Sequence, residues 1–128
     1  MIRSIDHIDF AVRNLEEFVE MFEKLGFKLI RHSPHYTGSV EFQLPGPNQP
    51  IFEIHQVGPR ENPGISHMAL LVEDLENECK ELAAKGISIE EGPVLVKASG
   101  RTLAIIRNPD GYRIQLVDTK RREAEKEE

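Results

Sequence analysis

A repeat with a constant spacing of sixty residues constrains the fold of this chain more than any other feature. The stretches from Ile5 to Phe27 and from Ile65 to Ile87 follow the same pattern. Their identities at this spacing are Ile5 with Ile65, His7 with His67, Val12 with Val72, Leu15 with Leu75, Glu16 with Glu76, and Gly26 with Gly86. Two copies are too few for a solenoid, so the repeat predicts a duplicated supersecondary unit whose two copies bury faces against each other.

The length of 128 residues and the composition predict a single soluble domain that packing alone stabilises. Its one cysteine, Cys79, cannot form an internal disulfide, which fits a reducing compartment. No apolar run reaches the ~20 residues of a membrane span, and the amino terminus lacks the apolar core of a signal peptide. The formal net charge of −6 argues against nucleic acid. We therefore expect a cytoplasmic protein with neither a membrane nor a nucleic-acid partner.

The first copy reads as a strand, a helix and three more strands. The segment 5–12 alternates with the two-residue period of a strand, and the apolar period then becomes helical. Asn14 and Glu17 form a capping box at the start of this helix, and Gly26 ends it. The remaining strands are expected at 27–31, 40–44 and 51–57. The first module therefore covers residues 4–57.

The second copy repeats this order in residues 65–118. Strands are expected at 66–72, 88–90, 101–107 and 112–118, with a helix at 75–85. A loop around Gly92 and Pro93, followed by a short extended piece at 94–96, separates two of these strands. The segment 58–64 is rich in proline and glycine and is predicted to be a linker between the modules, and 119–128 is predicted to be a charged tail.

These elements predict an α+β fold of two tandem βαβββ modules. One amphipathic helix covers only one face of each sheet, so the uncovered faces turn inward and form an open cup with the helices outside. A ferredoxin-like sandwich is the competing layout. It places a helix before every closing strand, so it fits three consecutive strands less well.

The uncovered face of each sheet is expected to collect polar side chains at the two-residue strand period. In the first copy these are His7, Asp9, Glu53 and His55, and in the second they are His67, Arg113 and Gln115. Glu53 and Gln115 correspond, because their spacing of sixty-two is the repeat spacing plus two residues inserted in a loop. Pseudo-symmetry therefore brings together two histidines, one glutamate and one glutamine.

Two imidazoles and one carboxylate around a point suit a borderline divalent ion, namely zinc, nickel, cobalt, manganese or ferrous iron. Such a site leaves positions open for water or substrate. The alternative is that His7 and His67 are merely tolerated in the core. Their equivalent places in the repeat, each with a polar residue on the matching closing strand, favour the metal site. Gln115 is the weakest of the four ligands.

Several segments of the chain together resemble one known family. They are HIDFAV from His7, IFEI from Ile51, ISHMALLVEDL from Ile65 and NPDGYRIQLV from Asn108. Over residues 4–118 the chain resembles the vicinal oxygen chelate superfamily. This superfamily includes glyoxalase I, bleomycin and fosfomycin resistance proteins, methylmalonyl-CoA epimerase and extradiol dioxygenases. The resemblance implies paired βαβββ modules and often a homodimer.

The resemblance also implies a site and a reaction. By position, the metal ligands are His7, Glu53, His67 and Gln115. Enzymes of this superfamily chelate two adjacent substrate oxygens on the metal and stabilise an enolate or oxyanion. The chain is therefore expected to be a glyoxalase-like lyase or isomerase that acts on a small carbonyl substrate.

Departures from the family pattern limit the reaction. The isomerases usually have a second glutamate where this chain has Gln115, which cannot accept a proton, so Glu53 is the candidate catalytic base. Asp9, His55 and Arg113 are candidates for orienting the substrate.

Two other functions stay open. A non-catalytic protein of the bleomycin-resistance type sequesters a ligand without metal, although that branch usually lacks the two histidines. An acyl-CoA epimerase shares metal-assisted proton abstraction but generally keeps an acid on the last strand. Bacterial glyoxalases tend to carry an arginine and an asparagine where this chain has Ala11 and Val57, which argues against glutathione as a substrate.

Overall fold

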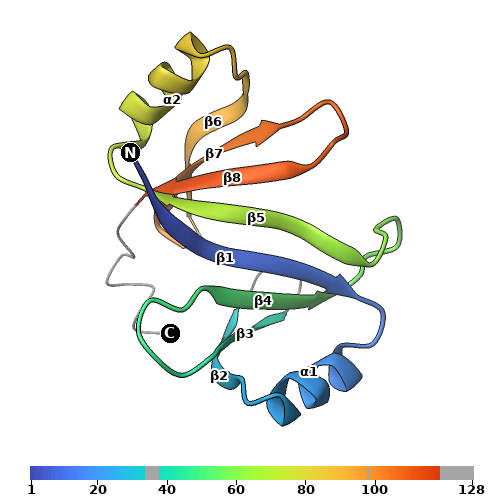
Figure 1. The fold of residues 1–128 in the computed structure, drawn as a ribbon. Helices are drawn as coiled ribbons and strands as arrows, with labels where there is room; N and C mark the ends of the chain where they lie inside the picture. The colour runs from blue at the N-terminus through green and yellow to red at the C-terminus, as the bar shows by residue number, and fades with distance from the viewer. Residues whose placement is uncertain (34–37, 98, 119–128) are drawn as a thin grey trace. The chain divides into compact units, whose positions relative to one another are not determined.

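The computed structural model describes residues 1–33, 38–97 and 99–118, which form ten helices and strands (Figure 1). The first five elements are β1 (Ile2–Val12), α1 (Leu15–Lys24), β2 (Lys28–Ser33), β3 (Ser39–Gln43) and β4 (Ile51–Gln56). The other five are β5 (Gly64–Val72), α2 (Leu75–Ala84), β6 (Ile89–Val96), β7 (Arg101–Arg107) and β8 (Arg113–Asp118). Among these residues, no helix is long and apolar enough to cross a bilayer.

The two halves of the chain have the same internal strand pairing. Over the described residues the strand order of the mixed sheet is β2-β3-β4-β1-β5-β8-β7-β6. In the first half β1 pairs with β4 in parallel, and in the second half β5 pairs with β8 in parallel. The hairpins β2–β3, β3–β4, β6–β7 and β7–β8 are antiparallel. This order confirms the predicted α+β fold of two βαβββ modules over the ferredoxin-like alternative.

The chain divides into two compact units, which are residues 7–66 and residues 1–6 together with 67–128. The first six residues therefore belong with the second half of the sequence. Buried Arg101 holds them there, because its Nη1 and Nη2 donate to the two carboxylate oxygens of Asp6 at 2.9 and 3.0 Å. This bidentate geometry is the strongest form of an arginine–carboxylate pair.

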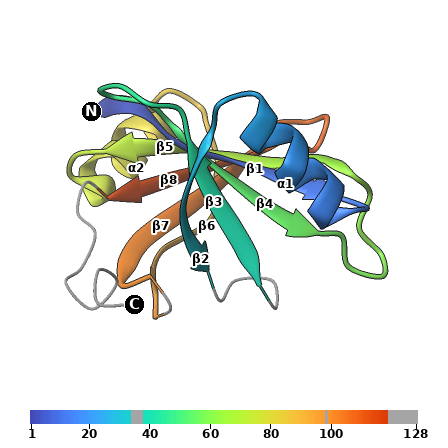
Figure 2. The same cartoon turned by 90° about the horizontal axis from the view of Figure 1, so that it is seen from below.

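Phenylalanine side chains form most of the core of the first unit. The predicted cap begins α1, since Asn14 Oδ1 accepts a hydrogen bond from the Glu17 amide at 3.0 Å. Phe22 of this helix is buried and lies edge-on to Phe42 and Phe52, with ring centroids 5.9 and 5.8 Å away. Edge-to-face contacts of this kind add stability beyond the buried area. Figure 2 shows α1 beside β4, which it contacts.

The core of the second unit is aliphatic. Its helix α2 contacts β6, β7 and β8. Its buried members are Val72, Leu75, Cys79, Leu82, Ala104 and Leu116. Cys79 is a free, buried thiol in this cluster, as expected of a packing residue.

The prediction of a loop at Gly92 and Pro93 is wrong, because both residues lie within the continuous strand β6. The pairing of β6 with β7 shifts register between Ile89 and Glu91 and again between Glu91 and Val94. Such register shifts mark β-bulges, in which one strand has an extra residue. Glycine is frequent in bulges as well as in turns, so it does not distinguish the two. The tail 119–128 and most of the loop predicted after Ser33 lie outside the described residues.

We predict that Gly92→Ala destabilises the protein more than Gly86→Ala. The two glycines have nearly the same positive φ, +88° and +90°, so both variants incur the left-handed strain of about 1–2 kcal/mol. A Cβ on Gly92 would also lie 2.5 Å from the Leu103 carbonyl oxygen, whereas one on Gly86 meets open space. Urea unfolding should therefore show a further loss of about 1–3 kcal/mol for the first variant. Equal losses would contradict the close approach.

Candidate metal centre

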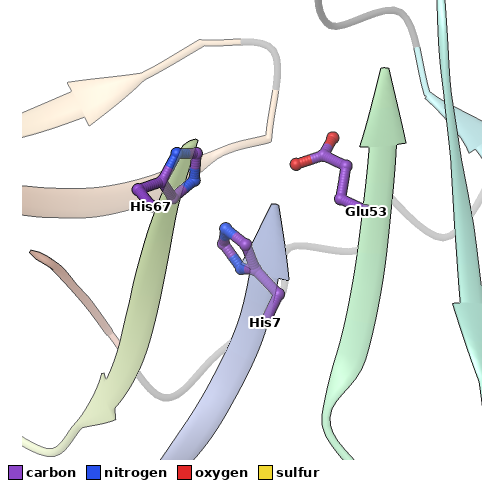
Figure 3. A group of neighbouring side chains, drawn as sticks. All are labelled: His7, Glu53 and His67. Carbon is purple, nitrogen blue, oxygen red and sulfur yellow. The ribbon is translucent and has the colours of Figure 1, made fainter. Parts of the chain in front are cut away.

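His7, Glu53 and His67 form a group that could hold a metal ion (Figure 3). They come from β1, β4 and β5, and the figure shows the three side chains pointing toward one another. Each offers one ligand atom, and these atoms all lie within 4.8 Å of one another. Ligands 2.0–2.2 Å from zinc lie up to about 4 Å apart, so the observed spacing is close to that of a bound ion. Glu53 and His67 are buried, and His7 is half-buried.

The strand registers place Glu53 and Gln115 at equivalent positions. Glu53 lies opposite Asp9 on β1, two residues after His7. Gln115 lies opposite Ala69 on β5, two residues after His67. Gln115 is buried, with 9% of its surface exposed. The offset of sixty-two residues therefore reflects a real structural correspondence between the two modules.

The strands beside these two residues differ in charge. On β3, Glu41 lies opposite Glu53, so this glutamate stands between two other buried acids. On β7, Ile105 lies opposite Gln115, so the glutamine stands between an isoleucine and an alanine. The first module thus surrounds its closing-strand ligand with carboxylates, and the second surrounds it with apolar side chains.

Ser39 supports the Glu53 carboxylate. Its Oγ donates a hydrogen bond to Glu53 Oε2 at 2.9 Å, and both residues are buried. The sequence predicts Ser39 only as the end of a loop, whereas it is the first residue of β3. The alternation of β3 is the signal that could have found it, because Val40 and Phe42 face the helix core and Ser39 therefore faces the other way.

Asp9 and His55, predicted to orient a substrate, are fully buried and bonded to each other. His55 Nδ1 lies 3.0 Å from Asp9 Oδ1. The other ring nitrogen, Nε2, lies 2.9 Å from Glu61 Oε2. Carboxylate oxygens only accept hydrogen bonds, so both contacts are satisfied together when both nitrogens of the ring carry a proton. A protonated His55 would therefore donate to an acid on each side.

Glu61 is a site-supporting residue that sequence reasoning missed. It lies in the segment 58–64, predicted to be a linker without a role in either module. Besides His55, its carboxylate accepts a hydrogen bond from the Gly58 amide at 3.1 Å. No local pattern marks this glutamate, because its partner His55 lies on a strand and the contact depends on how the chain turns after β4.

Burial and neighbouring charges shift the pKa values of this pair. Burial, and after it the nearby charge of Glu53, raise the pKa of Asp9 to about 6, against the lowering effect of its hydrogen bond to His55. Burial alone would lower the pKa of His55, but its hydrogen bonds to Glu61 and Asp9 outweigh burial and raise it. The two shifts show how closely the acids of this face are packed around one imidazolium.

Arg113 begins β8 on the same face as Gln115, as the strand period predicts. Its side chain is half-buried. In register it lies opposite Arg107, the last residue of β7.

Comparison with known proteins agrees with this fold. A family model described as the glyoxalase/bleomycin resistance protein/dioxygenase superfamily matches residues 4–116. The chain belongs to this superfamily. The resemblance found in the sequence is thereby confirmed over most of its length.

Relatives of the chain include lactoylglutathione lyases. That of Escherichia coli O157:H7 is 29% identical over 129 residues, which cover 89% of this chain and 91% of that protein. A probable lactoylglutathione lyase of Synechocystis sp. is 27% identical over 122 residues, with 88% and 93% covered. Among solved structures, methylmalonyl-CoA epimerase from Mycobacterium tuberculosis has a TM-score of 0.72 and 21% identity, with 93% of this chain and 89% of that chain covered. This last likeness shows the fold.

We predict that Glu61→Ala lowers the free energy of unfolding by about 1–3 kcal/mol, because it leaves one nitrogen of buried His55 without its acceptor. Arg60→Ala is the matched control, since Arg60 is exposed in the same segment and should change stability by less than about 0.5 kcal/mol. Urea unfolding followed by circular dichroism measures both. An equal, small effect of the two variants would show that the contact of Glu61 with His55 contributes nothing.

Proposed function

We propose that this protein is a divalent-metal-dependent, glyoxalase-like lyase or isomerase that acts on a small carbonyl substrate. The observation that carries the proposal is the convergence of His7, Glu53 and His67 within 4.8 Å on a fold of the glyoxalase superfamily. Lactoylglutathione lyases among the relatives support a lyase or isomerase rather than another reaction of the superfamily.

The metal ligands in this proposal are His7, Glu53 and His67, with Gln115 as a fourth. Two imidazoles with carboxylate and amide oxygens suit zinc, nickel, cobalt, manganese or ferrous iron. A divalent ion bound there would supply a Lewis acid that stabilises negative charge on the substrate oxygens. Ser39 would fix the carboxylate that faces the ion, as outer hydrogen-bond partners do in metal sites.

Glu53 is the proposed catalytic base. It is the only carboxylate among the four equivalent ligand positions, and Gln115 cannot take a proton. In this role Glu53 would accept the proton on the carbon next to the substrate carbonyl, and Ser39 would keep one of its oxygens in place. Asp9 and His55, bonded to each other on the same face, would position Glu53 rather than touch the substrate.

We propose that the substrate is not a glutathione conjugate. Ala11 and Val57 lack the polar groups needed to grip it. The homodimer and the cytoplasmic location expected from the sequence stay predictions.

Two other functions remain as outcomes of the tests below. A sequestering protein would bind small molecules without changing them. An acyl-CoA epimerase would exchange the same kind of proton but on a thioester. Exchange of a substrate proton with solvent is expected of both enzymes and not of a sequestering protein. The substrate on which exchange occurs distinguishes the epimerase from the proposed lyase or isomerase.

We predict that the purified protein, loaded with zinc or nickel and dialysed, keeps close to one equivalent of metal per chain. The double variant His7→Ala, His67→Ala should lose it, because one carboxylate and one amide do not hold such an ion. His32→Ala is the control, since His32 is exposed on β2 and lies outside the group. Elemental analysis measures the metal. Equal metal in the double variant and the wild type would assign it to another site, and a wild type that cannot be loaded would favour the sequestering protein.

We predict that the metal-loaded protein exchanges the α-proton of a small hydroxycarbonyl compound, such as hydroxyacetone or glyceraldehyde, with deuterated water. Glu53→Gln should slow this exchange by about a hundred- to ten-thousand-fold, the usual contribution of a positioned base. Glu20→Gln on the exposed face of α1 should leave the rate unchanged. Proton NMR follows the exchange. Full activity of Glu53→Gln would remove Glu53 as the base, and exchange only on an acyl-CoA thioester would favour the epimerase.

A further inference from the structure

The two histidines of the candidate metal centre have chemically different neighbours. On the first pair of parallel strands, His7 lies opposite Ile51. On the second pair, Met68 lies opposite Ile114, so the residues one step earlier, His67 and Arg113, face each other. The repeat therefore places an arginine beside one histidine and an isoleucine beside the other. Nothing in the duplicated fold requires this difference.

Arg113 lies within reach of two proposed ligands. Neighbouring strands are about 4.8 Å apart, so His67 and Arg113 start from adjacent backbone positions with their side chains on the same face. Gln115 follows two residues later on the same strand, about 6.6 Å along it. The backbone of Arg113 therefore lies beside the second module's half of the metal centre.

The charge of Arg113 is not neutralised by a bond within the described part of the chain. Its Nε is buried there without a hydrogen-bond partner. The nearby acid is Glu90, but Arg107 Nε and Nη2 already donate to both of its oxygens, at 2.8 and 3.0 Å. Glu90 is thus bonded to Arg107 and not to Arg113, whose charge acts on Glu90 only through space.

A half-buried guanidinium that forms no ion pair among the described residues is suited to bind an anion. Its planar fork matches the oxygens of a carboxylate or a phosphate, and such charge-assisted hydrogen bonds are among the strong ones. An arginine that served only as a surface charge would gain more from full exposure.

We propose that Arg113 binds an anionic group of the substrate, which makes the substrate a small carbonyl compound carrying a carboxylate or a phosphate close to its chelating oxygens. This inference rests on the proposed function, because the chelating oxygens are those that the metal would bind. It deepens that function by naming the substrate class and the residue that selects it.

Three hydroxamates separate the anion subsite from the metal site. Acetohydroxamate is a neutral chelator, N-hydroxyoxamate adds a carboxylate, and phosphonoacetohydroxamate adds a phosphonate. Isothermal titration of the metal-loaded protein gives the affinity of each. The wild type should prefer at least one of the anionic chelators over acetohydroxamate, and the better anion identifies a carboxylate or a phosphate.

Arg113→Met should reduce this preference by about ten- to hundredfold while leaving the affinity for acetohydroxamate unchanged. Arg3→Met is the matched control. It removes the same charge at an exposed position, where Arg3 pairs with Glu73, and should keep the preference. Arg113→Gln replaces Arg113→Met if thermal unfolding shows that the methionine variant does not fold.

The outcomes distinguish the two proposals. A wild type without preference, or a preference that survives in both Arg113 variants, would overturn the anion subsite and leave the metal centre intact. A preference that falls equally in Arg3→Met would also overturn it, because the effect would then be one of net charge. A protein that takes up no metal, or that binds none of the three chelators once loaded, would overturn the proposed function and the subsite with it.

Discussion

The parallel pairing of the first and last strand of each module is the constraint on which the candidate site depends. This pairing sets β1 against β4 and β5 against β8, so a residue two positions after each histidine faces Glu53 or Gln115. A slip by one residue would turn these side chains toward the helices, because strand side chains alternate between faces. The phenylalanine core under α1 and the aliphatic core under α2 oppose such a slip, since it would expose them to water.

The two modules have the same backbone fold but side chains of opposite charge on the face that holds the candidate site. The first gathers three buried acids on its face, Asp9, Glu41 and Glu53. It offsets them with a serine hydroxyl, the buried imidazolium of His55, and Arg31, which lies 3.3 Å from Glu41. The second module has lost the acids and gained an arginine. The proposed function assigns proton removal to the first module, and the proposed anion subsite assigns charge recognition to the second.

The sequence predicts the fold well because its signals are local. The alternation in β1, the Asn14 cap and the sixty-residue repeat each depend on neighbours in the chain or on the matching copy. Gly92 misled the prediction, since a bulge and a turn use the same residue. The histidines of the site were predictable from the repeat, whereas Ser39 and Glu61 were not. Their roles depend on contacts across 14 and 6 residues that no periodicity marks.

The position of Glu61 has a consequence for how this protein could be rearranged. The segment that joins the modules contains Glu61, which bonds to buried His55 of the first module. The segment therefore contributes to the structure of that module and does more than connect the two. A circular permutation opened between His55 and Glu61 would separate an ion pair that the chain now keeps only 6 residues apart. New termini placed after Glu61 would leave that pair intact. The two modules can therefore be exchanged as units only if residues 57–61 travel with the first.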